Sequence, residues 1–578
     1  MGLNFSNINS LWAGVMVETL LRLGLRSAVI CPGSRSTPLT VALARHDSIR
    51  AIAILDERSA AFWALGLAKS SGLPTVLVCT SGTAGANFYP AVIEAYQSAV
   101  PLIILTGDRP PELRRCASGQ TIDQIKLFGD FAQYFSEMAT PVASVEMLQY
   151  ARQTMVQAWR KALLPQQGVV HLNCPFRDPL APIPANDSLK FLRTELDSEH
   201  FFQAVQPLVK SRFSVETVPL PQWQKAATGI IIAGVDQPAN PEKYCQAIAR
   251  LSNYLGYPVL AEALSPVRNY ADYFSKLITS YDFILRDQAK AEALKADVVI
   301  QIGALPTSKI LRAWLQQSQP QTWILSARTE NLDPLHNPTQ QIQIEIEQLL
   351  KLLPDTEAKS LNYASVWQIH DRQIKEAIAC NFKEESDFVE AKIAWHLSQH
   401  LPANSAIVFA NSMTVRYAEF FWQTNHKKIQ PYFNRGANGI DGTLSTALGI
   451  AQNHSPCVLL TGDLALLHDT NGFLTLPQFQ GSLTIVVVNN NGGGIFEMLA
   501  IAAEKDLFEE FFATPQTVDL EKLCAVYGVS YQNIATENEL ISACETLPQQ
   551  GVRLLEIRGD RHQNIQWLKS LFEKFSGN

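Results

Sequence analysis

The sequence lacks an apolar run long enough to cross a membrane and a basic cluster suited to nucleic acid. No uninterrupted apolar segment of about 18 residues occurs in the chain, and the N-terminus has no basic region followed by an apolar stretch. Lysine and arginine form no run longer than two residues, and the formal net charge is −7. A membrane-spanning protein, a secreted protein and a nucleic-acid-binding protein are therefore all disfavoured.

Paired cysteines are also missing. The nine cysteines are scattered along the chain, several of them inside apolar runs, and none forms a C-x-x-C pair. This usage predicts reduced, buried thiols. We therefore expect a cytoplasmic protein.

Disordered, highly charged segments are scarce too, because 47% of the residues are hydrophobic and only 17% are charged. A chain of 578 residues is too long for a single core, so several domains are expected. A Pro-rich break at residues 179–187 and a polar stretch at 353–365, interpreted as a linker, divide the chain into domains 1–187, 188–355 and 356–578.

Each of these three domains contains a series of apolar runs that end at Gly, Pro, Asp or Asn. Such runs are typical of buried parallel strands. Stretches with helical periodicity, such as 60–69, separate them. The runs are SAVICPGS, IRAIAILDERS, PTVLVCTSGT, VPLIILTGDRP and GVVHLNCPF, then TGIIIAGVD, YPVLAEAL, ADVVIQIGALP and QTWILSA, then SAIVFANS, PCVLLTGD, LTIVVVNNN and VRLLEIRG. The pattern predicts an α/β protein with three doubly wound parallel-sheet domains, in which ligands bind beyond the carboxyl ends of the strands.

Two of these strand ends carry oxygen-bearing side chains. Asp463 follows one apolar run, and Asn490, 27 positions later, follows the next and precedes three glycines. A carboxylate and an amide oxygen suit Mg²⁺, and glycines allow the backbone to approach an anion closely. Either half alone would be typical of an ordinary strand-to-helix turn, since Asp, Asn and Gly are common turn residues.

Together, the two halves resemble the metal–diphosphate signature of thiamine diphosphate enzymes. Leu464 stands where that signature usually has a third glycine. Further motifs occur in the order and spacing of one family: PGSRSTPL, DERSAAFWALGLAK, TSGTAGANFYPAVIEA, TGDRPPEL, NSMTVR and NRGANGIDG. Over essentially its whole length, the chain resembles the 2-succinyl-5-enolpyruvyl-6-hydroxy-3-cyclohexene-1-carboxylate synthases of menaquinone and phylloquinone biosynthesis.

The resemblance implies a pyrimidine-binding domain at 1–187, a central domain at 188–355 and a diphosphate-binding domain at 356–578. It implies thiamine diphosphate and Mg²⁺ as cofactors, with Mn²⁺ as an alternative metal. Asp463, Asn490 and the carbonyl of Gly492 would hold the metal. Ile440 would support the bent cofactor, and an apolar wall would consist of Ile495, Phe496 and Leu499.

Glu57 is the candidate catalytic residue. By the resemblance its carboxyl group lies against N1′ of the aminopyrimidine. We interpret it as ending the apolar strand AIAIL, where a buried carboxyl group would favour the neutral form. The alternative is a surface glutamate that forms a salt bridge beside Asp56 and Arg58.

Arginines cluster in the strand-end motifs, as a site for carboxylate substrates requires. The resemblance implies 2-oxoglutarate and isochorismate as substrates. Ser412 and Arg416 would bind the distal carboxylate of the succinyl unit, and Arg435 would serve either substrate. The isochorismate side would consist of Ser34, Arg35, Arg109, Gln120 and Lys309. Family members often carry Asn before this glutamine, whereas Gly119 stands here; taken singly, each cation could be an ordinary surface charge.

The implied reaction is decarboxylation of 2-oxoglutarate and conjugate addition of the succinyl carbanion to isochorismate. One alternative is another thiamine 2-oxoacid decarboxylase or an acetolactate synthase-like carboligase, which would not need the arginines. Another is a non-catalytic thiamine-fold binding subunit, against which the presence of Glu57 argues. The only histidine in the motifs is His468, which disfavours decarboxylases that donate protons from histidine. A homodimer or homotetramer with sites shared between chains is expected.

Overall fold

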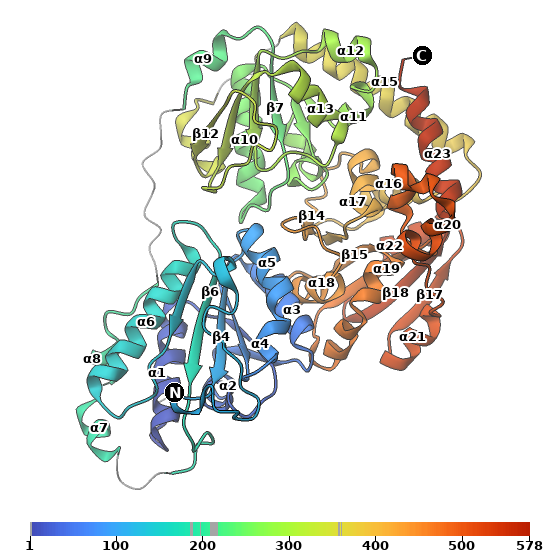
Figure 1. Cartoon of the computed structure of the whole chain (residues 1–578). Coiled ribbons are helices and arrows are strands. Elements are labelled where there is room, and N and C mark those ends of the chain that lie inside the picture. The colour runs from blue at the N-terminus through green and yellow to red at the C-terminus, as the bar shows by residue number, and fades with distance from the viewer. Residues whose placement is uncertain are drawn as a thin grey trace. The chain divides into compact units, whose positions relative to one another are not determined.

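The structure is a computed structural model that describes residues 3–184, 189–196, 198–207, 218–355, 359 and 361–577. These residues form two compact units. The first unit comprises Met1–Ser211, Asn434–His454 and His468–Gly481, and the second comprises Arg212–Phe433, Ser455–Leu467 and Ser482–Asn578. Figure 1 shows three sheets with helices on their faces.

The first unit contains a six-stranded sheet in the order β2-β1-β3-β4-β6-β5, and all of its pairings are parallel. Its strands are β1 (Ser27–Ile30), β2 (Arg50–Ala53), β3 (Thr75–Cys79), β4 (Leu102–Asp108), β5 (Tyr134–Glu137) and β6 (Val169–Pro175). The helices are α1 (Ile8–Leu23), α2 (Thr37–Ala44), α3 (Glu57–Ser71), α4 (Ala84–Asn87), α5 (Tyr89–Gln97), α6 (Val145–Leu163), α7 (Lys190–Glu195) and α8 (Ser198–Phe202). Trp12 of α1 and Trp159 of α6 belong to one buried cluster beside the sheet.

Helix α18 (Thr443–Ala451) also lies in the first unit, where it crosses α3 at very short range. A Cβ atom on Gly66 would lie 2.2 Å from the Thr446 carbonyl oxygen, and one on Gly449 would lie 2.2 Å from the Trp63 carbonyl oxygen. Only glycine therefore allows this crossing. The crossing packs a helix from the predicted third domain against α3, whose first residue is Glu57.

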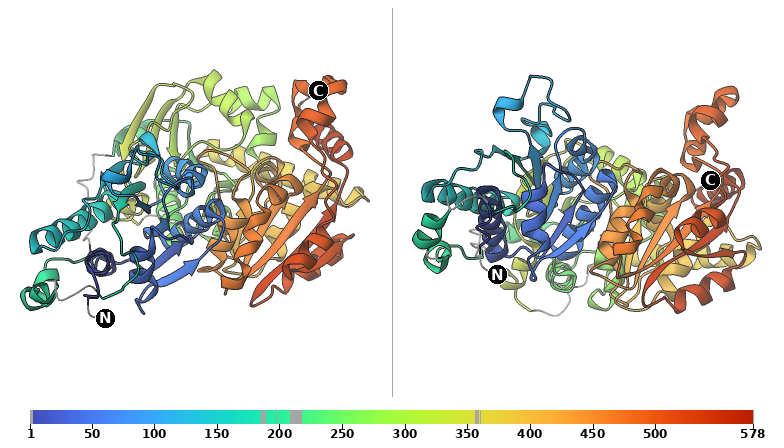
Figure 2. Two further views of the ribbon diagram at one scale, coloured as in Figure 1. Left: turned by 60° about the horizontal axis from the view of Figure 1, so that its bottom comes forward. Right: turned by 90° about the horizontal axis from the view of Figure 1, so that it is seen from below.

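The second unit contains two more parallel sheets. One has the order β12-β11-β10-β7-β8-β9 and the other β14-β13-β15-β16-β18-β17. Their strands are β7 (Gly229–Ala233), β8 (Val259–Ala261), β9 (Leu277–Ile278), β10 (Val298–Ile302), β11 (Gln321–Ser326) and β12 (Thr339–Gln343), then β13 (Ala406–Phe409), β14 (Gln430–Phe433), β15 (Cys457–Gly462), β16 (Ser482–Asn489), β17 (Ser530–Ile534) and β18 (Gly551–Arg558). Figure 2 shows the strands of the last sheet, orange to red, side by side.

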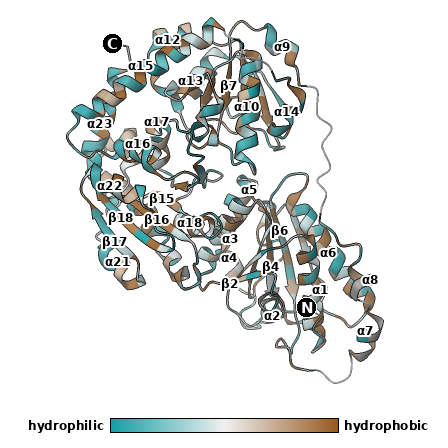
Figure 3. Cartoon of the chain, turned by 180° about the vertical axis from the view of Figure 1, so that it is seen from behind, coloured by the Kyte–Doolittle hydropathy of each residue, from teal (hydrophilic) through white to brown (hydrophobic). Residues whose placement is uncertain are grey.

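Helices cover both of these sheets. Around the first of them lie α9 (Leu220–Lys225), α10 (Pro241–Leu255), α11 (Tyr281–Ile284), α12 (Gln288–Ala293), α13 (Lys309–Ser318), α14 (Leu349–Leu352) and α15 (Asn362–Glu384). The remaining helices are α16 (Glu390–His400), α17 (Met413–Phe421), α19 (Asp463–His468), α20 (Lys505–Phe508), α21 (Leu520–Tyr527), α22 (Glu537–Glu545) and α23 (Arg561–Lys574). Figure 3 shows hydrophobic residues concentrated on central strands such as β15 and β16, while α15 and α23 alternate hydrophilic and hydrophobic residues. This distribution is typical of amphipathic helices that pack on a buried sheet.

The predicted fold class is confirmed, and all thirteen predicted strands are present among the eighteen described ones. Each of the five strands that were not predicted, β5, β9, β12, β14 and β17, lies at the edge of a sheet. The domain boundaries remain predictions. Of the Pro-rich break, residues 185–187 lie outside the described residues.

Three details of the sequence interpretation were wrong. Strand β2 ends at Ala53, so Glu57 does not end a strand. The supposed linker 353–365 includes the start of α15 at Asn362, although residues 356–358 and 360 lie outside the described part. All nine cysteines are free, but Cys116 and Cys380 are exposed rather than buried. In the described part of the chain, no helix has the length and hydrophobicity needed to span a bilayer.

Candidate active site

Asp463 and Gly492 lie against each other at the carboxyl ends of the neighbouring strands β15 and β16. Asp463 is 5% exposed, and its Oδ2 accepts a hydrogen bond from the Gly492 N–H (2.9 Å), while its Oδ1 accepts one from the Leu464 N–H (2.9 Å). Burial raises the pKa of Asp463, and its backbone donors oppose that rise. Within the described residues this carboxylate forms no ion pair. A bound cation would therefore stabilise it.

Asn490 lies at the same edge of the sheet and is held by a buried glutamate. Its Nδ2 donates a hydrogen bond to Oε1 of Glu390 (2.8 Å), at the first position of α16. Burial raises the pKa of Glu390 to about 7 against the opposing hydrogen bond from Asn490. Because Nδ2 faces Glu390, Oδ1 is the atom left to bind a ligand, and it accepts no hydrogen bond from the described residues.

These groups fit a divalent cation that also binds a diphosphate. The possible ligands are a carboxylate, an amide oxygen and the Gly492 carbonyl, an all-oxygen set that suits Mg²⁺. The Gly492 carbonyl accepts one hydrogen bond from Gly494 (2.9 Å) and keeps a second lone pair. Gly492 has φ +126°, and a Cβ atom there would lie 2.3 Å from the Ala513 carbonyl oxygen. Glycine is thus required at this position.

The residues of the predicted apolar wall follow directly after this turn. Ile495 and Phe496 are half-buried in the 3₁₀ turn Gly494–Met498, and Leu499 is 42% exposed. The Phe496 ring packs edge-on against Phe512 at 5.8 Å. The wall residues therefore lie on one segment, 495–513, that is anchored through aromatic packing and leaves Leu499 open to solvent.

Ser412 and Arg416 lie at the start of α17, after β13, the strand next to β15. Ser412 precedes the helix with φ +69° and ψ −132°, a backbone conformation that a serine rarely adopts and that is often found at functional sites. The Arg416 guanidinium donates to the Ser412 carbonyl oxygen one turn earlier. A serine hydroxyl and a half-buried guanidinium thus stand at the sheet edge that also carries Asp463.

Glu57 is the first residue of α3. Asp56 caps this helix by accepting from the Ser59 N–H (2.9 Å), and it also accepts from Asn471 Nδ2 (2.6 Å). Arg58 donates to the His468 carbonyl oxygen (2.8 Å). Glu57 is half-exposed, and its carboxylate forms no hydrogen bond or ion pair with a described residue. The predicted burial is therefore not observed in the single chain, and the alternative salt bridge beside Arg58 was wrong.

Arg35 and Arg109 bring two positive charges together beyond β1 and β4. Arg35 is 8% exposed and donates Nη1 to the Phe176 carbonyl oxygen (2.8 Å), whereas its buried Nε has no hydrogen-bond partner among the described residues. Burial, followed by repulsion from Arg109, lowers the pKa of Arg35. The carboxylates that oppose this shift are those of the exposed Asp178, at 3.8 Å, and of the buried Asp108. Two neighbouring guanidiniums beyond the strand ends favour an anionic ligand.

Ser81 connects Arg109 to Gln120. Arg109 Nη1 donates to Ser81 Oγ (3.2 Å), Ser81 Oγ donates to the Gln120 carbonyl oxygen (2.9 Å), and Gln120 Nε2 donates to the Ser81 carbonyl oxygen (3.0 Å). Gln120 itself is exposed and has φ +54°. Ser34, the remaining predicted residue of this group, is exposed next to Arg35. The structure therefore brings Arg35, Arg109 and Gln120 together.

The loop that carries Arg435 and Ile440 is anchored to α5. Buried Glu94 accepts hydrogen bonds from the Gly436 N–H (3.0 Å) and the Ala437 N–H (2.7 Å) through its two carboxylate oxygens. Ile440 is half-buried. Glu94 thus fixes the backbone between the two predicted residues.

Lys309 is the exposed first residue of α13, beside the central sheet. Its ammonium group forms no hydrogen bond or ion pair with any residue that the structure describes. It is therefore the predicted substrate residue with the least structural support.

Three known family domains match the chain, and each covers most of one sheet. Residues 12–127 match the thiamine pyrophosphate enzyme N-terminal TPP binding domain, residues 192–409 match the middle domain of thiamine pyrophosphate enzymes, and residues 412–557 match their C-terminal TPP binding domain. A 2-succinyl-5-enolpyruvyl-6-hydroxy-3-cyclohexene-1-carboxylate synthase from Gloeothece citriformis is 56% identical over 100% of both chains. The chain belongs to this synthase family.

Other members of the synthase family are nearly as similar. The proteins of this name from Rippkaea orientalis and Trichormus variabilis are each 52% identical to the chain and match 100% of its length. The match covers 98% of the first protein and 100% of the second. Among solved structures, benzoylformate decarboxylase from Polynucleobacter necessarius superposes with a TM-score of 0.68 at 17% identity, over 95% of this chain and 98% of that one. The latter likeness supports the fold alone.

Several residues that shape the site were not predicted. Glu390 orients Asn490, Glu94 anchors the loop 434–442, and Ser81 bridges Arg109 and Gln120. Glu94 offered a signal, because it is a lone acid within the apolar helical stretch YPAVIEA. Glu390 offered none, since its role depends on a contact with a residue 100 positions away.

Proposed function

We propose that the chain decarboxylates 2-oxoglutarate and adds the resulting succinyl unit to isochorismate, giving 2-succinyl-5-enolpyruvyl-6-hydroxy-3-cyclohexene-1-carboxylate. The observation that carries this proposal is the full-length match, at up to 56% identity among the relatives named above, to synthases of this compound. The guanidinium groups of Arg35 and Arg109 support it, because they lie near each other and both substrates carry carboxylates. The product would serve menaquinone or phylloquinone biosynthesis.

Asp463, Asn490 and the Gly492 carbonyl would hold Mg²⁺, or Mn²⁺ as an alternative, and through it the diphosphate of thiamine diphosphate. When bound, this cofactor supplies the carbon nucleophile and accepts the electrons released by decarboxylation. Glu57 would hold a proton at N1′ of the aminopyrimidine. Ile440 would support the bent cofactor, and Ile495, Phe496 and Leu499 would exclude water from its reactive ring.

The substrate carboxylates would bind to two groups of residues. Ser412 and Arg416 would bind the distal carboxylate of 2-oxoglutarate at the edge of the third sheet. The isochorismate carboxylates would bind to Arg35 and Arg109, with Arg435 serving either substrate. Ser34, Gln120 and Lys309 complete the proposed isochorismate side.

Assembly and domain roles follow from the same proposal. Domain 1–187 would bind the pyrimidine, domain 356–578 the diphosphate, and domain 188–355 would lie between them in the sequence. The active form would be a homodimer or homotetramer with sites shared between chains. The nine free cysteines are typical of a reducing compartment such as the cytoplasm.

The function is tested by following isochorismate absorbance in the presence of thiamine diphosphate, Mg²⁺ and 2-oxoglutarate. We expect loss of isochorismate that requires all three additions, with one CO₂ released for each isochorismate consumed. An acetolactate synthase-like enzyme would instead consume pyruvate and leave isochorismate unchanged. A non-catalytic subunit would bind the cofactor without releasing CO₂. Either result would overturn the proposal.

The two arginine groups predict opposite substrate selectivities. Arg416→Ala should raise the KM for 2-oxoglutarate by about 30- to 150-fold, because a charge-assisted hydrogen bond is worth about 2 to 3 kcal/mol. Arg35→Ala should raise the KM for isochorismate by a similar factor and leave that for 2-oxoglutarate nearly unchanged.

Steady-state kinetics with each substrate varied in turn checks this prediction. Arg115→Ala serves as the control, since the side chain of Arg115 is 90% exposed. Equal effects of both variants on both substrates would show that the two halves of the site are wrongly assigned.

A further inference from the structure

Arg561 holds two segments of the candidate site at once. It is the first residue of α23 and is 6% exposed. Its Nη1 donates to the Asn491 carbonyl oxygen (2.5 Å), its Nε donates to Glu497 Oε1 (3.2 Å), and its Nη2 donates to the Glu509 carboxylate. Asn491 lies between the proposed metal ligands Asn490 and Gly492, whereas both glutamates belong to the segment 495–513.

The residues 490–494, called the metal loop below, need support from outside because of their backbone conformation. Asn491 has φ +61° and Gly492 has φ +126°, so two successive residues lie in left-handed regions that give no regular backbone hydrogen bonds. Arg561 supplies a donor to the carbonyl of the first of them. The Gly492 N–H binds Asp463 and the Gly493 N–H binds the Ala513 carbonyl oxygen (2.8 Å).

A second connection ties the metal loop to the same turn of α23. Asn490 donates to Glu390, and the Glu390 N–H donates to Oδ1 of Asn564 (2.8 Å). Asn564 stands one turn after Arg561 and donates Nδ2 to the Asp560 carbonyl oxygen (2.8 Å). The first turn of α23 therefore holds the metal loop at two points. It reaches the side chain of Asn490 through Glu390, and it contacts the Asn491 carbonyl directly.

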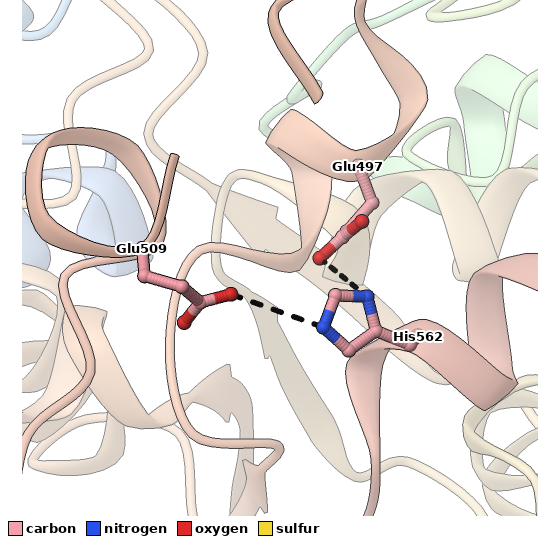
Figure 4. Close-up of side chains that lie close together, drawn as sticks. All are labelled: Glu497, Glu509 and His562. Atoms are coloured by element: carbon pink, nitrogen blue, oxygen red, sulfur yellow. Dashed lines mark ion pairs between the residues drawn. The ribbon is translucent and has the colours of Figure 1, made fainter. Parts of the chain in front are cut away.

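The nearby acidic cluster is explained by Arg561 rather than by a second metal. Figure 4 shows the His562 ring between the carboxylates of Glu497 and Glu509, at 2.9 and 3.8 Å. Arg561 binds these same two carboxylates and compensates one of their two negative charges. The cluster thus fastens the segment 495–513 to α23, with Arg561 as its cation.

We propose that Arg561 is a positioning residue that sets the geometry of the metal loop and couples it to the segment 495–513. The proposal rests on the proposed function, in which the metal loop binds Mg²⁺ and the segment covers the cofactor. Removing the guanidinium would free the Asn491 carbonyl and leave Glu497 and Glu509 without their shared partner. Binding of Mg²⁺ and order in the segment should then be lost together.

The test compares metal binding in three variants of the full-length protein. Isothermal titration with Mg²⁺ at saturating thiamine diphosphate should show a Kd raised by about 10- to 100-fold in Arg561→Ala, as for other residues that orient metal ligands. His562 contacts the same two carboxylates as Arg561 but does not contact Asn491. The Kd of His562→Ala for Mg²⁺ should therefore change by less than about fivefold. Asp463→Ala reports on the metal site itself.

Hydrogen–deuterium exchange provides the second readout. Arg561→Ala should exchange faster in both 490–494 and 495–513, whereas the double variant Glu497→Gln, Glu509→Gln should exchange faster only in 495–513. If Arg561→Ala does not fold, Arg561→Lys decides: one ammonium cannot serve all three acceptors, so its Kd should rise by about three- to tenfold.

The outcomes separate the two proposals. The positioning role is overturned if Asp463→Ala abolishes Mg²⁺ binding while Arg561→Ala keeps the wild-type Kd for Mg²⁺. If Arg561→Ala does not fold, the same criterion applies to Arg561→Lys. If Asp463→Ala also binds Mg²⁺ normally, the proposed metal site has failed. Restoration by Lys of part of the affinity lost in Arg561→Ala supports positioning through the donated hydrogen bonds.

Discussion

Replacement of Glu57 by glutamine is expected to lower kcat by at least about 100-fold, the lower range for the loss of a positioned acid–base group. Glutamine keeps the size and polarity of the side chain but cannot exchange a proton with N1′. Glu57 has no hydrogen-bond or ion-pair partner among the described residues, so the substitution should break no contact within the chain. The Kd of thiamine diphosphate, measured by titration, should therefore change little.

Glu146→Gln is the matched control for this variant. Glu146 is also an acid in the first turn of a helix, α6, of the same sheet domain, and it is exposed. Both substitutions remove a favourable interaction with a helix N-terminus, worth about 0.3 to 1 kcal/mol, and glutamine can still accept the hydrogen bond that Glu146 accepts from Ser144 Oγ (2.7 Å), so their effects on the free energy of unfolding should be similar. Only Glu57→Gln should lose turnover. Near-normal kcat in Glu57→Gln would remove Glu57 from the catalytic machinery.

Replacement of Asp463 by alanine should instead remove cofactor and metal binding together. Asp463 would supply the only carboxylate among the proposed ligands, and its Oδ2 also holds the Gly492 N–H in place. We expect the Kd values for Mg²⁺ and thiamine diphosphate to rise by at least about 100-fold, beyond the typical effect of residues that only orient ligands. Activity at ordinary cofactor concentrations should vanish.

Thermal unfolding with and without cofactor measures this loss independently of activity. Ligand at about 100 times its Kd stabilises the wild-type fold by about 2.7 kcal/mol, and this increment should disappear in Asp463→Ala. Asp463→Asn, which keeps an oxygen ligand without the charge, should retain part of it. If Asp463→Ala kept a full cofactor-dependent increase in Tm yet stayed inactive, Asp463 would not be a metal ligand.

The central strands could be predicted from the sequence because burial on both faces leaves a continuous apolar run, as in LTIVVVN of β16. Of the six described edge strands, only β2 could. β12 reads TQQIQ and has one buried residue, β17 reads SYQNI and also has one, and β9 has only two residues. Edge strands pair on one side only and tolerate polar side chains, so their sequences resemble loops. β14 is fully buried, but its proline masks the strand pattern.

The candidate site shows the same division. That Asp463 and Asn490 lie at one sheet edge could be predicted because they follow two strands of one parallel sheet, and Arg35 and Arg109 follow two strands of another. The residues that orient them were not, because these contacts join positions far apart in sequence: Glu390 and Asn490 are 100 residues apart, and Arg561 and Asn491 are 70 apart. The start of α3 had a local signal in Asp56, a typical helix cap that accepts from Ser59. The interpretation of Glu57 as the end of a strand was wrong because it gave no weight to this cap.

We propose that Glu57 and Asp463 act on one cofactor although they belong to different domains. In a dimer with shared sites, each chain would supply one residue to each site. Mixing equal amounts of Glu57→Gln and Asp463→Ala under conditions of subunit exchange tests this directly, since a mixed dimer would gather both lesions in one site and leave the other intact. Activity of the mixture should recover to about a quarter of wild type, because half of the dimers are mixed and each has one good site of two. No recovery, despite exchange demonstrated by mass spectrometry of differently tagged chains, would contradict a site built from two chains.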